Sequence, residues 1–359
     1  MPLYPVIERL GKNIGHFIGR RPAIFFTNIL LTYRCTQRCL QCTIPELART
    51  HPQMAYKDYI RIIDKLDGYG TQGLTLSGGE PMSHPDLAEM LRYAAGKSFT
   101  NIHLLTTLYA SEKVIDRTLD AVFENNISLS CSFDGFDQVA DTLRGGRNVS
   151  ERVLAGMEKF NARNKARTHP LGAYMNIVIS QQNLYQIPKI LELAESIGWK
   201  VNIDLYRWSS ENHREVDDMK ITDTDQLDAV IDRAKRSPNV ITPEWLLNGY
   251  PGYLQGTFKK YCPYLDNRTL GSKFFIHPNG DVAVCIGEPV GNLLISEPAE
   301  IFGSEAWRER NKAFHECRGC WNTCYTPAAR MSSYIGLKTI KQTWQMLGRA
   351  MFKTVKNGG

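Results

Sequence analysis

The stretch Cys35-Thr-Gln-Arg-Cys39-Leu-Gln-Cys42 places three thiols within eight residues, near the start of a chain of 359 residues. Five more cysteines fall in the last third of the chain, and Cys131 stands alone between the two groups. No secretory signal is apparent, because the apolar stretch Pro22–Leu31 is short and starts late. We therefore expect a cytoplasmic protein, whose clustered thiols bind metal rather than form disulfides.

Three cysteines alone do not close a structural zinc site, which needs four ligands, and the nearest histidines are His16 and His51. A [4Fe–4S] cluster bound by three thiolates is different, since it leaves one iron open for a substrate or cofactor. The spacing also differs from the equal three-residue steps of bacterial ferredoxins. We therefore favour an iron–sulfur cluster, and a zinc site completed by a distant ligand remains the alternative.

The overall composition is that of an ordinary globular protein, with 43% hydrophobic and 22% charged residues. It excludes wholesale disorder and collagen-like repeats, and the length suggests two domains or one large domain with an appendage. No run approaches the length of a transmembrane helix, about 18 apolar residues. The net charge of +6 is compatible with anionic ligands or membrane surfaces, and we expect no nucleic-acid partner.

Short apolar segments alternate with helical ones, which is the pattern of a parallel sheet with crossover helices. The expected strands are Ala23–Leu31, Gly73–Leu76, Asn101–Thr106, Ile127–Phe133, Ala173–Ser180 and Lys200–Tyr206. The three-cysteine loop follows the first strand, and Ser77-Gly-Gly-Glu80-Pro81 follows the second. Because ligands of such α/β sheets bind at the carboxyl ends of the strands, both motifs are expected at one site.

The three-cysteine loop, together with Gly78-Gly79-Glu80 after the second strand, resembles the motifs of radical S-adenosylmethionine (SAM) enzymes. The resemblance covers roughly Phe25–Ser209 and implies an α/β fold, the partial (β/α)6 barrel of that family. It implies that the open iron chelates SAM, and that the reduced cluster cleaves SAM to a 5′-deoxyadenosyl radical, which abstracts hydrogen from the substrate. Gly78 and Gly79 have no Cβ and would let the backbone approach the methionine amino group, while Glu80 would compensate nearby positive charge.

The same resemblance implies further SAM contacts at other strand ends. The residue before the third cysteine is usually aromatic in this family, whereas Gln41 here retains only a backbone contact to adenine. The polar end of the fourth strand, Ser130 or Ser132, is expected near the SAM ribose. Asn176 and Ser180 share one face of the fifth strand, where family members often carry polar SAM contacts.

Two further residues near these strand ends have simpler interpretations. The pair Asp134-Gly135 after the fourth strand is explained as well by a turn as by a site. Cys131 lies mid-strand between two serines, and we expect it to be a small buried hydrophobe.

The last third of the chain predicts a second metal site. Lys273–His277 and Asp281–Cys285 form a hairpin, and Gly280 followed by Cys285 reproduces the Gly-x4-Cys element of the SPASM and twitch extensions of radical SAM enzymes. That resemblance suggests an auxiliary [4Fe–4S] cluster bound by Cys262, Cys285, Cys317 and Cys320. Cys324 is then spare, replaces one of these ligands, or donates a hydrogen atom to the substrate. A zinc ribbon is the alternative.

We expect five segments along the chain. They are an N-terminal amphipathic helix (1–22), the radical SAM partial barrel (23–210), a helical connector (211–258), a small auxiliary-cluster domain containing the hairpin (259–330) and a basic amphipathic tail (331–359). Basic amphipathic helices bind anionic membranes, so one expectation is a location at the inner face of the membrane. The other is that both terminal helices cap the folded domains, with their charges in solvent.

The sequence says less about the substrate than about the cofactors. Many maturases of ribosomally made peptides carry a recognition domain before the barrel, and only 34 residues precede Cys35 here. We therefore expect a small-molecule substrate, such as a sugar, aminocyclitol or lipid precursor. It would be oxidised with help from the auxiliary cluster, after a reductant such as flavodoxin or ferredoxin has supplied an electron. The alternatives are a peptide maturase, a redox-neutral epimerase that uses Cys324, and a non-enzymatic iron–sulfur sensor.

Overall fold

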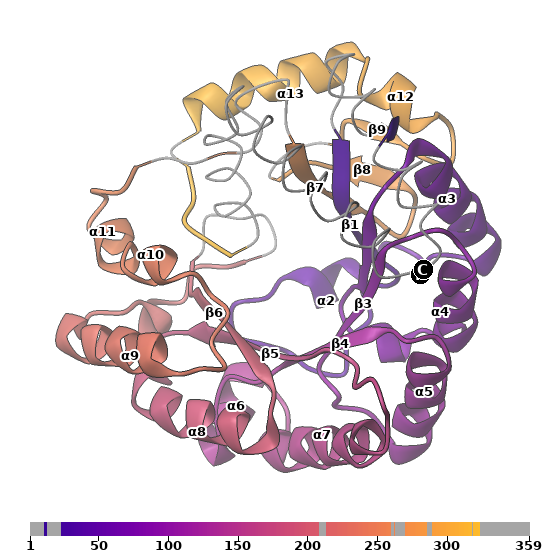
Figure 1. Ribbon diagram of the computed structural model, residues 1–359. Coiled ribbons are helices and arrows are strands. Elements are labelled where there is room, and N and C mark those ends of the chain that lie inside the picture. Colours follow the sequence, from indigo (N-terminus) through magenta and orange to yellow (C-terminus); the bar gives the residue numbers. More distant parts are fainter. Residues whose placement is uncertain are drawn as a thin grey trace, which may run out of the picture.

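The computed structural model describes residues 11–12, 23–207, 213–259, 262, 270–285, 289–317 and 319–323. Figure 1 shows strands in the centre of the molecule and helices around them. Among the described residues, no helix is both long and apolar enough to cross a membrane. Apart from two helical positions at 11–12, the predicted terminal helices lie outside the described residues, as does Cys324.

The centre of the fold is one sheet of nine strands. Their bounds are Ala23–Leu30 (β1), Gly73–Ser77 (β2), Asn101–Thr106 (β3), Ser128–Ser132 (β4), Ala173–Ile179 (β5), Lys200–Leu205 (β6), Leu270–Ile276 (β7), Asp281–Ala283 (β8) and Gly291–Asn292 (β9). The order in the sheet is β6-β5-β4-β3-β2-β1-β7-β8-β9. Neighbours from β6 to β7 are parallel, whereas β7, β8 and β9 are antiparallel.

The predicted α/β partial barrel is confirmed, because the six expected strands are all present and parallel, and the barrel is not closed. The predicted hairpin is also present, as β7 and β8. The sequence did not predict that β7 pairs in parallel with β1, with Asn28 opposite Phe275. The auxiliary hairpin therefore continues the barrel sheet.

Helices follow most of the parallel strands and cover the outer face of the sheet (Figure 1). The α-helices are Ile44–Leu47 (α2), Tyr56–Tyr69 (α3), Leu87–Ala95 (α4), Glu112–Glu124 (α5), Asp137–Arg144 (α6), Val149–Lys165 (α7), Ile187–Ile197 (α8), Thr224–Arg236 (α9), Glu244–Leu247 (α10), Tyr250–Leu254 (α11), Pro298–Ile301 (α12) and Glu305–Glu316 (α13). Three short 3-10 helices are Pro81–Ser83 (η1), Leu184–Gln186 (η2) and Asp217–Met219 (η3).

Alternation along the strands separates an apolar outer face from a polar inner face. Leu104 in β3, Leu129 in β4 and Met175 in β5 are fully buried in the main core with the helices. Burial of each such side chain stabilises the fold by about 1.5–3 kcal/mol. Since successive strand residues point to opposite faces, His103 and Asn176 lie on the inner face of the barrel.

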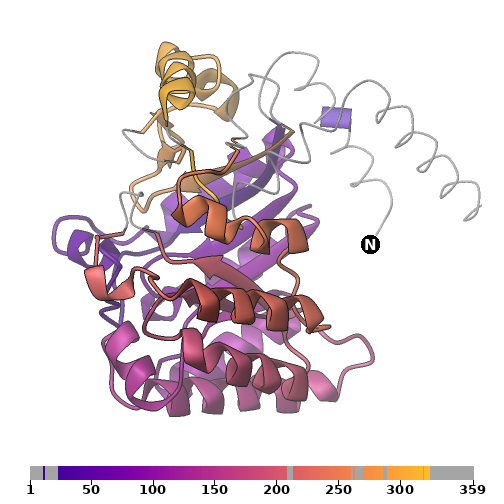
Figure 2. The ribbon, with the colours of Figure 1, turned by 90° about the vertical axis from the view of Figure 1, so that its left-hand side faces the viewer.

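The C-terminal helices pack against the sheet through a cluster of aromatic side chains. The ring centroids of Phe274 in β7 and Phe302 after α12 are 4.7 Å apart, and those of Phe274 and Trp307 in α13 are 5.8 Å apart. Figure 2 shows the result from the side, with α12 and α13 at the end of the molecule opposite α7.

After α13 the chain returns to the open edge of the barrel. The Trp321 Nε1–H donates to Leu246 O in α10 (2.7 Å). A Cβ on Gly249 would lie 2.1 Å from the Trp321 ring, so only glycine leaves room for this side chain. Two residues later, the Thr323 hydroxyl donates to Asp204 Oδ2 in β6 (3.3 Å). The segment 319–323 therefore lies against β6 and α10.

Candidate functional site

The cysteine loop, residues 31–43, begins where β1 ends and is joined to the turn after β2. The Gly79 N–H donates to Thr32 O (2.7 Å). The Glu80 N–H donates to Arg34 O (2.8 Å). Gly78 has a φ of +148°, and a Cβ on it would lie 2.3 Å from Thr32 O. A Cβ on Gly79 would lie 2.5 Å from Arg34 O, so the loop backbone itself requires glycine at both positions.

The other side of the cysteine loop is held by the end of α6. The Arg38 N–H donates to Arg144 O, and the Leu40 N–H donates to Leu143 O, each over 3.0 Å. Gly145 ends the helix with a φ of +59°, and a Cβ there would lie 2.2 Å from Arg38 O. The loop is thus fixed between the Gly-Gly-Glu turn and α6, which gives the three thiols a defined position.

Cys35, Cys39 and Cys42 are partly exposed in this loop. The Gln37 N–H donates to Cys35 Sγ (3.4 Å), and Arg144 Nη1 donates to Cys39 Sγ (3.9 Å). Burial raises the pKa of Cys35 to about 12 and that of Cys42 to about 11, so thiolates here need a cation such as iron to form. Three thiols of one loop with donors to their sulfurs fit a [4Fe–4S] cluster.

Glu80 is fully buried at the end of β2, and its carboxylate has four donors from the chain. Oε1 accepts from the Thr106 hydroxyl (2.6 Å) and the Met82 N–H (3.0 Å). Oε2 accepts from the N–H (2.7 Å) and the hydroxyl (2.6 Å) of Thr107. Glu80 is therefore a buried link between the ends of β2 and β3, and its role in compensating charge at SAM stays a prediction.

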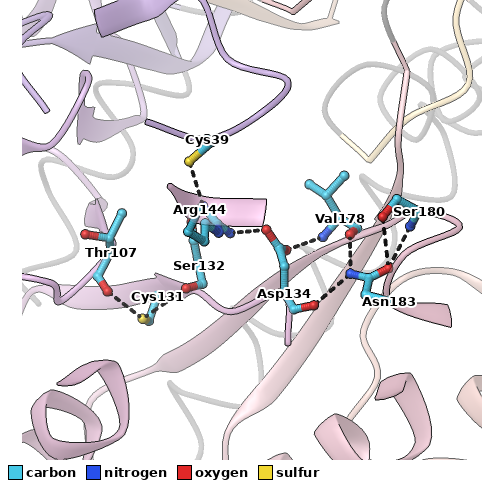
Figure 3. Close-up of polar contacts among 9 residues, drawn as sticks. All are labelled: Cys39, Thr107, Cys131, Ser132, Asp134, Arg144, Val178, Ser180 and Asn183. Atoms are coloured by element: carbon cyan, nitrogen blue, oxygen red, sulfur yellow. Dashed lines mark hydrogen bonds and ion pairs between the residues drawn. The ribbon is translucent and has the colours of Figure 1, made fainter. Parts of the chain in front are cut away.

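Figure 3 shows a buried ion pair between Asp134, which follows β4, and Arg144 at the end of α6. Arg144 Nη2 and Asp134 Oδ2 are 2.5 Å apart. Asp134 Oδ1 also accepts from the Val178 N–H (2.8 Å), and its backbone oxygen accepts from Asn183 Nδ2 (2.7 Å). The turn interpretation of Asp134 missed this pair, for which the only signal in the sequence was an acidic residue at a strand end.

Only some of the predicted SAM contacts on β4 and β5 lie next to one another. Ser132 and Asn176 are cross-strand partners, and Asn202 of β6 continues the row. Ser180 lies beyond the end of β5 in a turn, where its N–H (2.7 Å) and hydroxyl (3.3 Å) both donate to Asn183 Oδ1 (Figure 3). Ser132 and Asn176 are thus neighbours on the inner face, whereas Ser180 stabilises the turn.

Ser130 contacts a residue that the sequence did not single out. Its hydroxyl and His103 Nε2 are 2.5 Å apart, and His103 Nδ1 lies 2.9 Å from the Ser128 hydroxyl. Alternation along β3 could have indicated His103. Cys131, the predicted buried thiol between Ser130 and Ser132, is fully buried, and its Sγ donates to Thr107 O (3.4 Å).

Gln41, the predicted adenine neighbour, is buried in the cysteine loop. Its backbone oxygen accepts from the Arg214 N–H (2.8 Å). Its side-chain Oε1 is buried without a hydrogen-bond partner among the described residues, so an acceptor remains beside the thiols. Such an orphaned group fits a site that receives a further molecule.

The four predicted auxiliary ligands, Cys262, Cys285, Cys317 and Cys320, are all described, and all except Cys317 are partly buried. Burial raises the pKa of Cys320 to about 12; Arg207 lowers it, and the other three thiolates raise it further. The Gly319 N–H donates to Cys317 Sγ (3.3 Å), repeating the contact of Gln37 with Cys35.

Cys285 itself has a φ of +61°, an uncommon conformation for a residue with a side chain. In the part of the chain that the structure describes, no group of three or more histidine, cysteine, aspartate or glutamate side chains is arranged to hold a metal ion. The ligand sets at both sites therefore stay predictions, which the chemistry of their donors fits.

Asp204 is a further inner-face residue that the sequence analysis missed. Its Oδ2 accepts from the Thr323 hydroxyl, and Asn202 Nδ2 donates to the same hydroxyl (3.2 Å). Burial raises the pKa of Asp204, although Arg207 opposes the rise. The polar residues at every second position of β6 could have indicated Asp204 in the sequence. A half-buried carboxylate thus lies beside the segment that carries Cys320.

Residues 29–194 match the family model described as the radical SAM superfamily. The chain is 28% identical over 188 residues to PqqA peptide cyclase of Granulibacter bethesdensis, covering 51% of this chain and 48% of that protein. It is 27% identical over 170 residues to AdoMet-dependent heme synthase of Methanosarcina barkeri, covering 47% and 46%. The chain thus spans about half the length of the curated relatives it matches.

Two solved structures share the fold. Streptococcus suis SuiB has a TM-score of 0.64 and 16% identity, over 86% of this chain and 73% of SuiB. The enzyme anSMEcpe, solved with AdoMet and the Cp18Cys peptide, has a TM-score of 0.59 and 15% identity, over 79% of this chain and 81% of that one. The family match over residues 29–194, together with the thiol loop at the mouth of the barrel, shows that this part of the chain is a domain of the radical SAM superfamily, which binds a [4Fe–4S] cluster and SAM.

Proposed function

We propose that this chain is a radical SAM peptide maturase, an enzyme that cleaves SAM reductively and modifies a peptide at a C–H bond. The observation that carries the proposal is the three-thiol loop, which the Gly-Gly-Glu turn holds at the barrel mouth within residues 29–194. When bound, the reduced cluster and SAM supply a 5′-deoxyadenosyl radical that abstracts a hydrogen atom from the substrate, as the family resemblance implies.

A peptide substrate has more support than the small molecule that the sequence favoured. The matched relatives include PqqA peptide cyclases, and SuiB and anSMEcpe have each been solved with a peptide bound. The small number of residues before Cys35 weighs little against this, because a separate protein can deliver a peptide to the barrel. The relatives therefore favour the peptide maturase over the sugar, aminocyclitol or lipid precursor.

Polar side chains on the inner face suit a peptide. Asn176 and Asn202 are cross-strand partners, and Asn202 Nδ2 donates to Asn176 Oδ1 (3.4 Å). This contact orients the Asn176 amide, whose Nδ2 is a donor that matches a backbone carbonyl of an extended peptide. Asp204 is our candidate for the proton acceptor. Net oxidation removes a hydrogen atom first, and then one electron and one proton, so a base must take up that proton. Burial raises the pKa of Asp204, so its carboxylate is a stronger base than that of an ordinary aspartate.

We assign the electron acceptor to the auxiliary thiols. Cys262, Cys285, Cys317 and Cys320 would hold a second [4Fe–4S] cluster, which when bound supplies a one-electron acceptor for the oxidation. Thr323, in the segment that follows Cys320, is bonded to Asp204. This contact supports an auxiliary site close to the inner face, where the candidate proton acceptor lies.

The reductant would approach the protein at a basic pocket beside the first thiols. Arg38, Arg49 and Arg214 line a cavity of about 280 Å³ together with Cys39 and Cys42. All three arginines are exposed, and the acidic lining residue, Glu46, is paired with Arg214. An excess of positive charge next to the thiols suits an acidic one-electron donor, such as flavodoxin or ferredoxin.

Anaerobic reconstitution tests the proposed activity. Wild-type protein supplied with iron, sulfide, SAM and dithionite is expected to release 5′-deoxyadenosine. The variant with Cys35, Cys39 and Cys42 all replaced by Ala should release none, whereas Cys131→Ala, which removes a buried thiol outside both sites, should retain the activity. Reconstituted wild type with bound iron but without 5′-deoxyadenosine would support the iron–sulfur sensor instead.

The substrate class needs a separate experiment. Synthetic peptides encoded by short reading frames beside the gene are incubated with the reconstituted enzyme, in parallel with a panel of sugars, aminocyclitols and lipid precursors. We expect one peptide to stimulate 5′-deoxyadenosine release and to lose two mass units. If only a small molecule stimulates 5′-deoxyadenosine release, the substrate is a small molecule rather than a peptide.

The donor pocket is tested by Arg49→Glu. This charge reversal should slow cluster reduction by reduced flavodoxin, and the slowing should weaken at high salt. Reduction by dithionite serves as the control and should not change. Arg236→Glu, an exposed reversal on α9 that does not line the pocket, should match wild type with both reductants. Equal rates for Arg49→Glu and wild type with flavodoxin would place the donor elsewhere.

A further inference from the structure

Arg144 is a buried cation beside one of the cluster thiols. Its side chain is 10% exposed, and its Nη1 donates to Cys39 Sγ over 3.9 Å. Figure 3 shows the guanidinium between Cys39 on one side and Asp134 on the other. The Nε of Arg144 is buried and has no partner among the described residues, so the group retains an unused donor.

The position of this cation is fixed from both ends. The Arg38 N–H donates to the backbone oxygen of Arg144, so α6 and the cysteine loop cannot separate without breaking this bond. On the other side, the 1% exposed carboxylate of Asp134 is held by the guanidinium and by the Val178 N–H. Asn183 binds the backbone oxygen of Asp134. A buried row of contacts therefore runs from Cys39 to the end of β5.

A buried charge has a strong effect on a neighbouring redox centre. Two unit charges in a low-dielectric interior interact several times more strongly than they do in water. Reduction adds one negative charge to an iron–sulfur cluster, and both nearby charge and hydrogen bonds to sulfur set its potential. A cation next to Cys39 stabilises the reduced form, and the carboxylate of Asp134 opposes that effect.

We propose that Arg144, oriented by Asp134, is a positioning residue that raises the reduction potential of the SAM-binding cluster. The inference rests on the proposed function, because it requires that the cysteine loop hold that cluster. In this proposal, the charges of Arg144 and Asp134 help to set a cluster potential that a protein donor can reach. Because Arg144 and Asp134 carry opposite charges, replacing each of them should shift the potential in the opposite direction, which makes the proposal testable.

The experiment measures the midpoint potential of the SAM-binding cluster by anaerobic titration followed by EPR, in protein whose auxiliary ligands Cys317 and Cys320 are replaced by Ala. Arg144→Met removes the cation and should lower the potential. Asp134→Asn leaves the cation unopposed and should raise it. We expect each variant to change the equilibrium between oxidised and reduced cluster about tenfold, which corresponds to about 59 mV for one electron.

Arg163→Met is the matched control. Arg163 of α7 also forms an ion pair with an aspartate, Asp120 of α5, but it is 39% exposed and contacts neither the cysteine loop nor the pocket beside it. This variant loses a surface ion pair and should keep the wild-type potential. If Arg144→Met does not retain iron, the Asp134→Asn measurement decides. Potentials that stay at the wild-type value, or that fall in both variants, would overturn the proposal and leave the ion pair a purely structural role.

Iron content separates this inference from the proposed function. A wild-type protein that assembles no [4Fe–4S] cluster would refute the proposed function. A wild-type protein with a reducible cluster, whose potential is the same in Asp134→Asn, would refute only the role of the ion pair.

Discussion

Glu80 and Thr107 are joined by two hydrogen bonds to a single carboxylate oxygen, one from the backbone N–H of Thr107 (2.7 Å) and one from its hydroxyl (2.6 Å). The N–H of the same Glu80 donates to Arg34 O in the cysteine loop. One buried residue therefore connects β3 to the loop that carries the thiols. The geometry of the cluster site consequently depends on a carboxylate that does not need to touch SAM.

The first prediction follows from this link. Glu80→Ala leaves the hydroxyls of Thr106 and Thr107 and the Thr107 N–H without their buried acceptor, so we expect the free energy of unfolding to fall by about 3 kcal/mol. SAM binding should weaken while the cluster remains. Urea unfolding and SAM titration of reconstituted protein measure the two effects.

Glu89→Ala is the control, because Glu89 lies on α4 with 52% of its side chain exposed, and the substitution should change neither quantity. Weaker SAM binding in Glu80→Ala at unchanged stability would contradict the structural role and favour direct charge compensation at SAM.

The second prediction concerns the contact between the glycine turn and the cysteine loop. Gly79→Ala places a Cβ 2.5 Å from Arg34 O, which forces the loop away from β2, so we expect the variant to bind far less iron at the first site. Gly68→Ala in α3 has nothing within 4 Å and should stabilise the protein by up to about 1 kcal/mol. Iron analysis and urea unfolding of both variants test this. A Gly79→Ala protein with full iron content would show that the loop tolerates the displacement.

The third prediction concerns Asp204, the half-buried carboxylate of β6. Burial raises the pKa of Asp204, so the folded state binds this proton more tightly than the unfolded state does. Stability is therefore lost as pH rises from the ordinary aspartate pKa, about 3.9, through the raised folded value. Asp204→Asn lacks this loss and should be more stable than wild type at neutral pH, with the difference vanishing in acid. Urea unfolding across a pH series measures it.

If Asp204 is also the proton acceptor, the stabilised Asp204→Asn variant should turn over substrate poorly while it still binds SAM. Such a combination is expected at functional sites, where activity and stability conflict. Equal stability of the two proteins at every pH would mean that Arg207 and Thr323 fully offset the burial of the carboxylate.

Local patterns predicted the elements well. The expected strand Asn101–Thr106 agrees with the structure at both ends. The expected fifth strand continued to Ser180, whereas β5 ends at Ile179, because Ser180 turns to bond Asn183. Hydrophobic periodicity and the positions of glycine and cysteine depend on near neighbours in the chain, which is why they can be recognised in a single sequence.

Contacts between distant segments could not be predicted in the same way. The pairing of β7 with β1 and the bond from Thr323 to Asp204 join residues more than a hundred positions apart. The ion pair of Asp134 with Arg144 spans only ten residues, yet it depends on how α6 turns back over the barrel mouth. No local period encodes such contacts, because tertiary packing decides them.

The fourth prediction is the iron content. Three and four suitably placed cysteines predict two [4Fe–4S] clusters, so the reconstituted wild type should hold about eight irons and the Cys35/Cys39/Cys42→Ala variant about four. Cys131→Ala should stay at about eight. Metal analysis of anaerobically purified protein provides the measurement. Zinc in the triple variant would contradict the auxiliary iron–sulfur cluster and favour a zinc site formed by the same C-terminal cysteines.

The last prediction concerns the fate of the substrate radical. Loss of an electron gives net oxidation, for which four auxiliary thiols provide an acceptor site, whereas return of a hydrogen atom gives epimerisation, for which a spare thiol is a suitable donor. Cys324, the candidate donor, lies outside the described residues, and its four neighbouring thiols are accounted for by the proposed cluster. We therefore expect oxidation, with one 5′-deoxyadenosine released per turnover and a product two mass units lighter. Cys324→Ala should keep its iron and this activity. A product of unchanged mass that gains one deuterium in heavy water, and that Cys324→Ala no longer forms while it keeps both clusters, would replace oxidation with epimerisation.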